Sequence, residues 1–284
     1  MKKIILSLMM FGVVGAASAQ ETPSADAILD KYLAAIGGKE ALSKIEDIAI
    51  STVAETQRGS MESEVKFKKG NKFSSVVYMM GNEVMRQTCD GTKVAFTSGF
   101  GGNTNSSTLE GKDAAGAILQ AAPFPELLYA EFNVQKTVVG KEAVNGKDAW
   151  KVEFAIPEGR KWNDFFDVET GLKVKRAGSG EGQRGPRPDG QGGGQRPEGQ
   201  QGGQRPEGGG GQGGQGGGRG GMGGGMMGGG MMNAALSDYK EIKDGNGVKI
   251  PYIREQGNGQ FSSKAEVTSV KVNKGIKDNN FVIK

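Results

Sequence analysis

Residues 60–98 read SMESEVKFKKGNKFSSVVYMMGNEVMRQTCDGTKVAFTS, and they carry the clearest fold signal in the chain. Runs of β-forming residues are separated by Lys69-Gly70-Asn71, Gly81-Asn82 and Asp90-Gly91. Asn and Asp beside Gly tolerate the positive φ angles that tight hairpin turns need. The stretch therefore predicts four short strands joined as an antiparallel meander.

Helices are predicted on both sides of this meander. Residues 24–36 have apolar side chains at helical spacing, with Ser24 as the N-cap and Gly37-Gly38 as the stop. A helical turn over 39–44 then leads into a strand over 45–55. After the meander, a loop is predicted over 99–107. Two short helices are predicted over 112–122 and 123–132, broken at Pro123 and Pro125.

Strands resume beyond these helices. Trp150, Val152, Phe154 and Ile156 alternate with polar residues and follow an Asn145-Gly146 turn. Further strands are predicted over 133–139, 161–168, 172–176, 236–242, 248–256, 261–272 and 281–283, with Pro251 at an edge or bulge position. Because the helices interrupt one sheet, the sequence predicts an α+β fold with a single strongly curved antiparallel sheet of roughly ten to twelve strands.

Composition excludes several kinds of chemistry. The 284 residues include no histidine, which removes Ser-His-Asp and Cys-His nucleophile systems, HExxH metallopeptidases and most zinc and iron sites. Cys89 is the only cysteine, so no intrachain disulfide can form. The formal net charge of +4 is mild and does not indicate nucleic-acid binding. We expect no cofactor and no metal.

Residues 1–20 predict a secretory signal peptide. Lys2 and Lys3 precede an apolar core over 4–14, and Ala17-Ser18-Ala19 supplies the cleavage pattern. Cleavage is expected after Ala19 or Gln20. The signal peptide predicts an exported, periplasmic protein. Because its apolar run is too short to span a bilayer, we expect the protein to be at most peripheral to a membrane. We also expect a monomer.

A Gly-rich segment over 178–232 divides the remaining chain. It holds most of the 50 glycines and repeats Gln-Arg-Pro-Glu-Gly, with almost no residue that can bury surface. We therefore expect a disordered loop between two adjacent strands. Residues 21–177 and 233–284 are then expected to form one domain.

The order of several motifs resembles a known family. K-x-K-K-G-N-K-F over 66–73 is followed by Asp90-Gly91, the two helices, F-D-x-x-T-G-L over 166–172 and N-x-G-I-x-D-x-x-F over 273–281. This order is similar to that of the periplasmic lipoprotein carriers of outer-membrane lipoprotein sorting, the LolA/LolB-like superfamily. The Ala-Ile-Gly-Gly over 35–38 is similar to Bacteroidetes-type members.

The resemblance implies an unclosed β-barrel wrapped on short lid helices, with an N-terminal helix and an apolar cavity. Lys69 occupies the position of the arginine that holds the lid in the true carrier. The function expected is non-catalytic carriage or binding of a lipid or an acylated protein. The candidate cavity residues are Val65, Phe67, Phe73, Val77, Met79, Phe96, Leu119, Phe124, Leu127, Leu128, Trp150, Phe154 and Trp162.

Two other functions remain compatible with the sequence. A hydrolase would use carboxylates such as Glu153, Asp164 and Asp167, since glycosidase-type chemistry needs only two carboxyl groups. Asp167 also fits a plain turn residue before Glu169-Thr170-Gly171. A structural or interaction protein would instead use the Gly-rich segment to reach an envelope protein partner.

Overall fold

The computed structural model describes residues 22–56, 59–100, 103–157, 159–178, 233–257 and 262–283. The helices are α1 (Ala25–Ala35), α2 (Lys39–Ser43), α3 (Gly111–Ala121) and the 3-10 helices η1 (Pro125–Leu128) and η2 (Asp278–Phe281). The strands are β1 (Asp47–Thr56), β2 (Gly59–Lys68), β3 (Lys72–Met79), β4 (Asn82–Asp90), β5 (Val94–Phe100), β6 (Asn103–Leu109), β7 (Gln135–Val144), β8 (Lys147–Ala155), β9 (Lys161–Asp167), β10 (Lys173–Gly178), β11 (Ala234–Glu241), β12 (Lys249–Gly257) and β13 (Ser262–Val272). The predicted signal peptide and residues 179–232 of the Gly-rich segment lie outside the described ranges.

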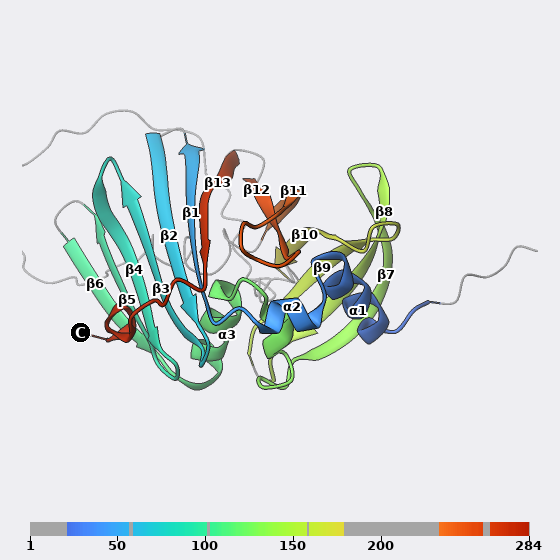
Figure 1. Cartoon of the computed structure of the whole chain (residues 1–284), viewed down its shortest axis with the longest axis horizontal. Coiled ribbons are helices and arrows are strands. Elements are labelled where there is room, and N and C mark those ends of the chain that lie inside the picture. The colour runs from blue at the N-terminus through green and yellow to red at the C-terminus, as the bar shows by residue number, and fades with distance from the viewer. Residues whose placement is uncertain are drawn as a thin grey trace, which may run out of the picture.

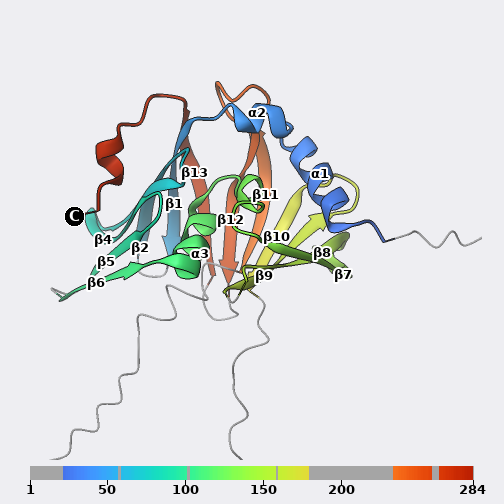
Figure 2. The same ribbon diagram turned by 90° about the horizontal axis from the view of Figure 1, so that it is seen from below.

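Within these ranges, thirteen strands form one antiparallel sheet in the order β6-β5-β4-β3-β2-β1-β13-β12-β11-β10-β9-β8-β7 (Figure 1). The edge strands β6 and β7 do not pair with each other, so the sheet stays open. It curves around α3 and η1, while α1 and α2 lie along one end (Figure 2). The predicted α+β fold with an unclosed, curved sheet is confirmed.

Local chemistry explains most of the turns and helix ends. Asn145 and Gly146 have φ values of 52° and 78° and form the predicted hairpin turn. The β3–β4 turn is at Met80-Gly81, one residue earlier than predicted. Gly37 ends α1 with φ 122°, and a Cβ there would lie 2.9 Å from the carbonyl oxygen of Gly247. Only glycine allows this close approach of α1 to the β11–β12 connection.

Three predicted elements need correction. The loop predicted over 99–107 is wrong in its second half, because Asn103–Leu109 form edge strand β6 through backbone pairing with β5. Its Asn, Ser and Thr side chains show no apolar alternation, so the pattern could not reveal it. The second predicted helix is only the short η1. The predicted strand over 281–283 is wrong, since η2 occupies this end of the chain and contacts β3 and β4 from outside the curve.

Pro251 illustrates how a central strand accommodates proline. It pairs with Tyr239 of β11, but the β12–β13 pairing begins only at Ile253. Pro251 therefore lies where β12 is locally an edge, and its missing N–H costs no sheet hydrogen bond. None of the helices in the described ranges is long and apolar enough to cross a membrane.

Candidate functional site

Residues 111–132, which we call the covering segment, fill the concave side of the sheet (Figure 2). They comprise α3, η1 and the turn that follows. Ala114, Ala117 and Ile118 pack on Phe73, Cys89 and Val94. Leu119, Phe124 and Tyr129 join the larger cluster that contains Phe154 and Trp162. The covering segment thus packs on both core clusters of the concave face.

The predicted cavity residues lie mainly beneath this segment. Buried members are Phe73, Val77, Phe96, Leu119, Phe124, Phe154 and Trp162, half-buried members are Val65, Phe67, Met79, Leu128 and Trp150, and Leu127 is exposed. Eight of them belong to the two core clusters or pack against them, namely Phe67, Phe73, Leu119, Phe124, Leu128, Trp150, Phe154 and Trp162, whereas Val65, Val77, Met79, Phe96 and Leu127 lie outside these clusters. A ligand that contacts them has to displace the covering segment.

An aromatic cluster occupies the middle of the interior. Phe154 stacks on Trp162 with a centroid separation of 5.6 Å, and Tyr129 packs on Phe154 at 5.0 Å. Phe166 approaches Phe154 at 6.5 Å and Tyr32 of α1 at 5.4 Å. The cluster thereby connects α1, the covering segment and strands β8 and β9.

Beside the aromatic cluster lies a buried ionic network. The two Asp164 oxygens accept hydrogen bonds from Arg176 at 2.7 and 2.8 Å. Lys173 ion-pairs with Asp164 at 3.3 Å and with Glu126 of the covering segment. The β9–β10 pairing shifts register between Lys173 and Lys175, and this bulge turns both Lys173 and Arg176 toward Asp164.

Charge states in the network follow from these contacts. Burial acts to raise the pKa of Asp164, but the charges of Arg176 and Lys173 outweigh it and hold that pKa below its ordinary value. Burial acts to lower the pKa of Arg176, and Asp164 reverses the effect and raises it. Burial, followed by the charge of Glu126, raises the pKa of Tyr129 and keeps its hydroxyl neutral.

Three buried polar atoms among the described residues have no hydrogen-bond partner. They are Glu126 Oε2, the Tyr129 hydroxyl and Trp162 Nε1. Trp162 lies near the Tyr129 hydroxyl and acts slightly to lower the pKa of Tyr129. The indole N–H and the hydroxyl nevertheless do not form a hydrogen bond with each other. Unpaired buried polar groups are costly and rare in native proteins, so each of these three atoms calls for a partner or a role.

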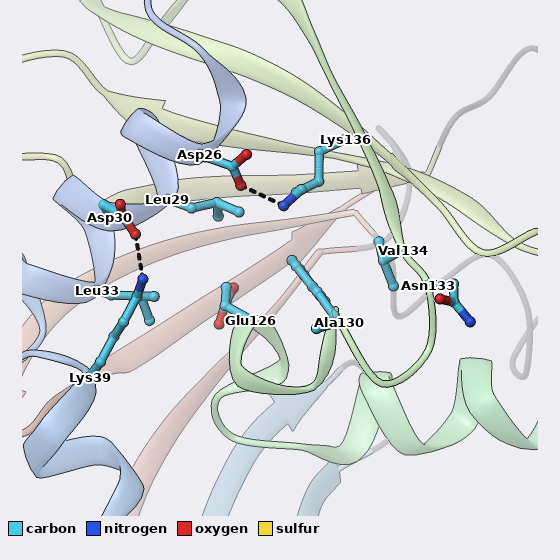
Figure 3. A pocket seen from close by; sticks show the side chains of 11 residues that line it. Asp26, Leu29, Asp30, Leu33, Lys39, Glu126, Ala130, Asn133, Val134 and Lys136 are labelled. Atoms are coloured by element: carbon cyan, nitrogen blue, oxygen red, sulfur yellow. Dashed lines mark hydrogen bonds and ion pairs between the residues drawn. The ribbon is translucent and has the colours of Figure 1, made fainter.

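A pocket of about 400 Å³ opens between α1 and the covering segment (Figure 3). Leu29, Leu33 and Val134 supply apolar wall, and Glu126 and Tyr129 also line it. Two ion pairs lie at the pocket, Asp30 with Lys39 at 2.7 Å and Asp26 with Lys136 at 2.5 Å. The pocket therefore combines apolar walls with two of the residues that hold an unpaired polar atom.

The β2–β3 turn contacts the covering segment, although not through Lys69. The Lys69 amine ion-pairs with Glu46 at 2.5 Å, outside the segment. Two residues later, Asn71 donates a hydrogen bond from Nδ2 to Glu131 Oε1 at 2.5 Å. Asn71 has φ 60°, a conformation that Asn tolerates well. Asn71, which follows the turn glycine Gly70, thus links the β2–β3 turn to the covering segment.

The carboxylates considered for hydrolysis do not converge. Glu153 pairs across the sheet with Asn163, so it points away from the face that holds Phe154 and Asp164. Asp167 accepts hydrogen bonds from the backbone of Glu169 and Thr170, which confirms it as a turn residue. No group of three His, Cys, Asp or Glu suited to a metal occurs in the described part of the chain.

Sequence reasoning missed the ionic network. Asp164 was a candidate only as an isolated carboxylate, and Lys173, Arg176 and Glu126 gave no pattern. Two cations three residues apart on a strand should point to opposite faces, and the bulge that brings them together has no sequence signature here.

No family model matches the sequence, and no curated protein matches it. Similar solved structures include a LolA superfamily protein from Nitrosomonas europaea, with 9% identity, 92% of this chain and 99% of that chain covered, and a TM-score of 0.49. A DUF1329 family protein from Desulfovibrio piger has 11% identity, coverage of 92% and 98%, and a TM-score of 0.45. A domain named for outer membrane lipoprotein sorting, from Vibrio parahaemolyticus, has 11% identity, coverage of 86% and 93%, and a TM-score of 0.39. At these values, function has to be argued from the chain's own residues.

Proposed function

We propose that this protein is a non-catalytic periplasmic carrier or binding protein for an apolar ligand, either a lipid or the acyl chains of a lipoprotein. The ligand lies between the concave face of the sheet and the covering segment. Such sites are concave and mostly apolar, with a few polar groups that fix the ligand's orientation. The predicted cavity residues form the wall of this site.

The position of Tyr129 is the observation that carries the proposal. Its side chain lines the pocket beside α1 and also packs on Phe154 in the aromatic cluster. Tyr129 therefore lies between the pocket and the aromatic cluster. Movement of the segment would join the two spaces into one long apolar groove.

The composition of α3 favours its replacement by an acyl chain on the concave face of the sheet. Its face toward the sheet is largely alanine, and Ala114, Ala115 and Ala117 are buried. Each methylene that an acyl chain buries contributes about 0.8 kcal/mol. An acyl chain of many methylenes can therefore offset the alanine methyl contacts that α3 loses when it moves.

Filling the pocket tests the proposal. Ala130 lines the pocket and is exposed, so Ala130→Trp places an indole in the opening without disturbing the core. Wild-type protein purified from the periplasm without detergent should release lipid in an organic extract, at about one molecule per protein. We expect Ala130→Trp to reduce this occupancy about tenfold, because the indole takes up the space of the ligand.

Ala143→Trp is the matched control. Ala143 is also exposed and lines a different hollow, beside Val144 and Lys175. Its occupancy, measured by the same mass spectrometry, should equal that of the wild type. Equal occupancy in all three proteins, or no lipid in the wild type, would contradict the proposal.

The Asn71–Glu131 hydrogen bond gives a second prediction. Asn71→Asp keeps a residue that tolerates positive φ but places two carboxylates side by side, which repels the covering segment from the turn. We expect severalfold faster uptake of a fluorescent fatty acid in stopped-flow mixing. The double variant Asn71→Asp/Glu131→Lys should restore the wild-type rate by forming an ion pair. Unchanged uptake in Asn71→Asp would show that the segment does not open at this turn.

A further inference from the structure

The four charged side chains of the interior network balance one another. Glu126 and Asp164 supply two carboxylates, and Lys173 and Arg176 already engage both of them. The tyrosines nearby contribute no charge, because burial raises the pKa of Tyr32 and Tyr129 well above the ordinary value. Any further cation on this face is therefore uncompensated.

Arg254 is that further cation. Arg176 pairs with Ala234 across β10 and β11, Ala234 pairs with Gln256 of β12, and Arg254 lies two residues from Gln256. Paired residues, and residues two apart on one strand, share a face of the sheet. Arg254 therefore points to the same face as Arg176, toward the ends of strands β10 to β12.

The surroundings of Arg254 lack a counter-ion among the described residues. Burial lowers the pKa of its guanidinium, the charge of Arg176 lowers it further, and only Tyr239 acts in the opposite direction. No carboxylate of the described ranges contributes. Arg254 is nevertheless exposed to solvent, so that a ligand can reach it.

A second donor lies close to Arg176. Arg176 is stacked over the ring of Trp162 at 5.8 Å, and the buried Nε1–H of Trp162 has no acceptor. Trp162 is also part of the aromatic cluster, next to Phe154. The Trp162 N–H is therefore an unpaired hydrogen-bond donor beside Arg176, at the border of the apolar interior.

We propose that Arg254, supported by Arg176, binds the oxyanion head group of an amphiphile whose apolar tail lies under the covering segment. The proposal rests on the function proposed above and names the ligand class more closely. A guanidinium binds carboxylate and phosphate oxygens in a bidentate manner, so both head groups suit this position. The single-chain ligand is then oriented, with its charged end at Arg254 and its tail along the aromatic cluster.

Three probes of equal chain length test the head-group proposal separately from the proposed function. Palmitate, hexadecyl phosphate and methyl palmitate are titrated into delipidated protein, and tryptophan fluorescence reports binding. We expect wild-type protein to bind both anions at least about tenfold more tightly than the neutral ester. Which anion binds more tightly distinguishes a carboxylate ligand from a phosphate ligand.

Arg254→Gln should abolish the preference for the anions while leaving the affinity for methyl palmitate unchanged. Arg254→Lys should restore part of it, and Arg86→Gln, on distant strand β4, should leave it intact. Because Arg254→Gln removes an uncompensated charge, its midpoint of urea unfolding should equal or exceed that of the wild type.

Two results would overturn the head-group proposal alone. One is equal affinity of wild-type protein for the anions and the ester. The other is an equal loss of affinity for all three probes in Arg254→Gln, with a lower unfolding midpoint, which would mark a structural role. If the ester and both anions all fail to bind wild-type protein, the proposed function fails as well.

Discussion

Asp164→Ala should destabilise the protein by about 3–5 kcal/mol, the cost of removing one partner from a buried ionic network. Asp164 is fully buried, and both of its oxygens bind Arg176 while Lys173 lies at 3.3 Å. Without Asp164, Arg176 keeps its charge in the interior with no counter-ion beside it. Urea unfolding, followed by circular dichroism, measures the loss.

Two comparisons show whether the charge is responsible. Asp148→Ala changes an exposed carboxylate on neighbouring strand β8 and should shift the free energy of unfolding by less than about 0.5 kcal/mol. Asp164→Leu/Arg176→Met removes both members of the close pair and should be more stable than Asp164→Ala. If Asp164→Ala unfolds at the wild-type urea concentration, the network contributes nothing to stability.

Phe154→Ala should also cost about 3–5 kcal/mol, because it removes a large side chain from a packed interior. Phe154 has no exposed surface and contacts Tyr129, Trp162 and Phe166. The rings around it belong to strand β9 and the covering segment, so the space closes only if one of these two elements shifts. Urea unfolding again provides the measurement.

Val139→Ala is the control for packing, since Val139 is 56% exposed on β7 and its truncation should change stability by less than about 0.5 kcal/mol. The proposed function adds a further expectation for Phe154→Ala. Its cavity lies where we place the acyl chain, so added fatty acid should raise its unfolding midpoint more than that of the wild type. A stability loss without this larger ligand effect would identify Phe154 as ordinary core.

The sequence was informative wherever a local rule determined the structure. The turn at Asn145-Gly146, the helix stop at Gly37 and the alternation of Trp150, Val152 and Phe154 all follow from backbone preference or period. The resemblance also implied the open curved sheet. Edge strand β6 was missed because its polar residues are held by backbone pairing alone.

The candidate site was less accessible to sequence reasoning. Apolar residues could be assigned to the interior, but the pattern could not show that the covering segment packs on them. The network of Asp164, Lys173 and Arg176 depends on a bulge, and its link to Glu126 joins residues 47 positions apart. Such contacts depend on tertiary structure, and no periodicity encodes them.

The position of β1 has a consequence for folding. Two runs of consecutive strands, β1 to β6 and β7 to β13, consist of neighbours in sequence, and they meet only where β1 pairs with β13. That pairing joins Ile48 to Val272, so it closes a loop of most of the chain and must follow the local hairpins. Of the thirteen strands in the described ranges, β13 is synthesised last. Until it arrives, β1 presents a free edge in what becomes the middle of the sheet, and a nascent chain is open there to pairing with another molecule.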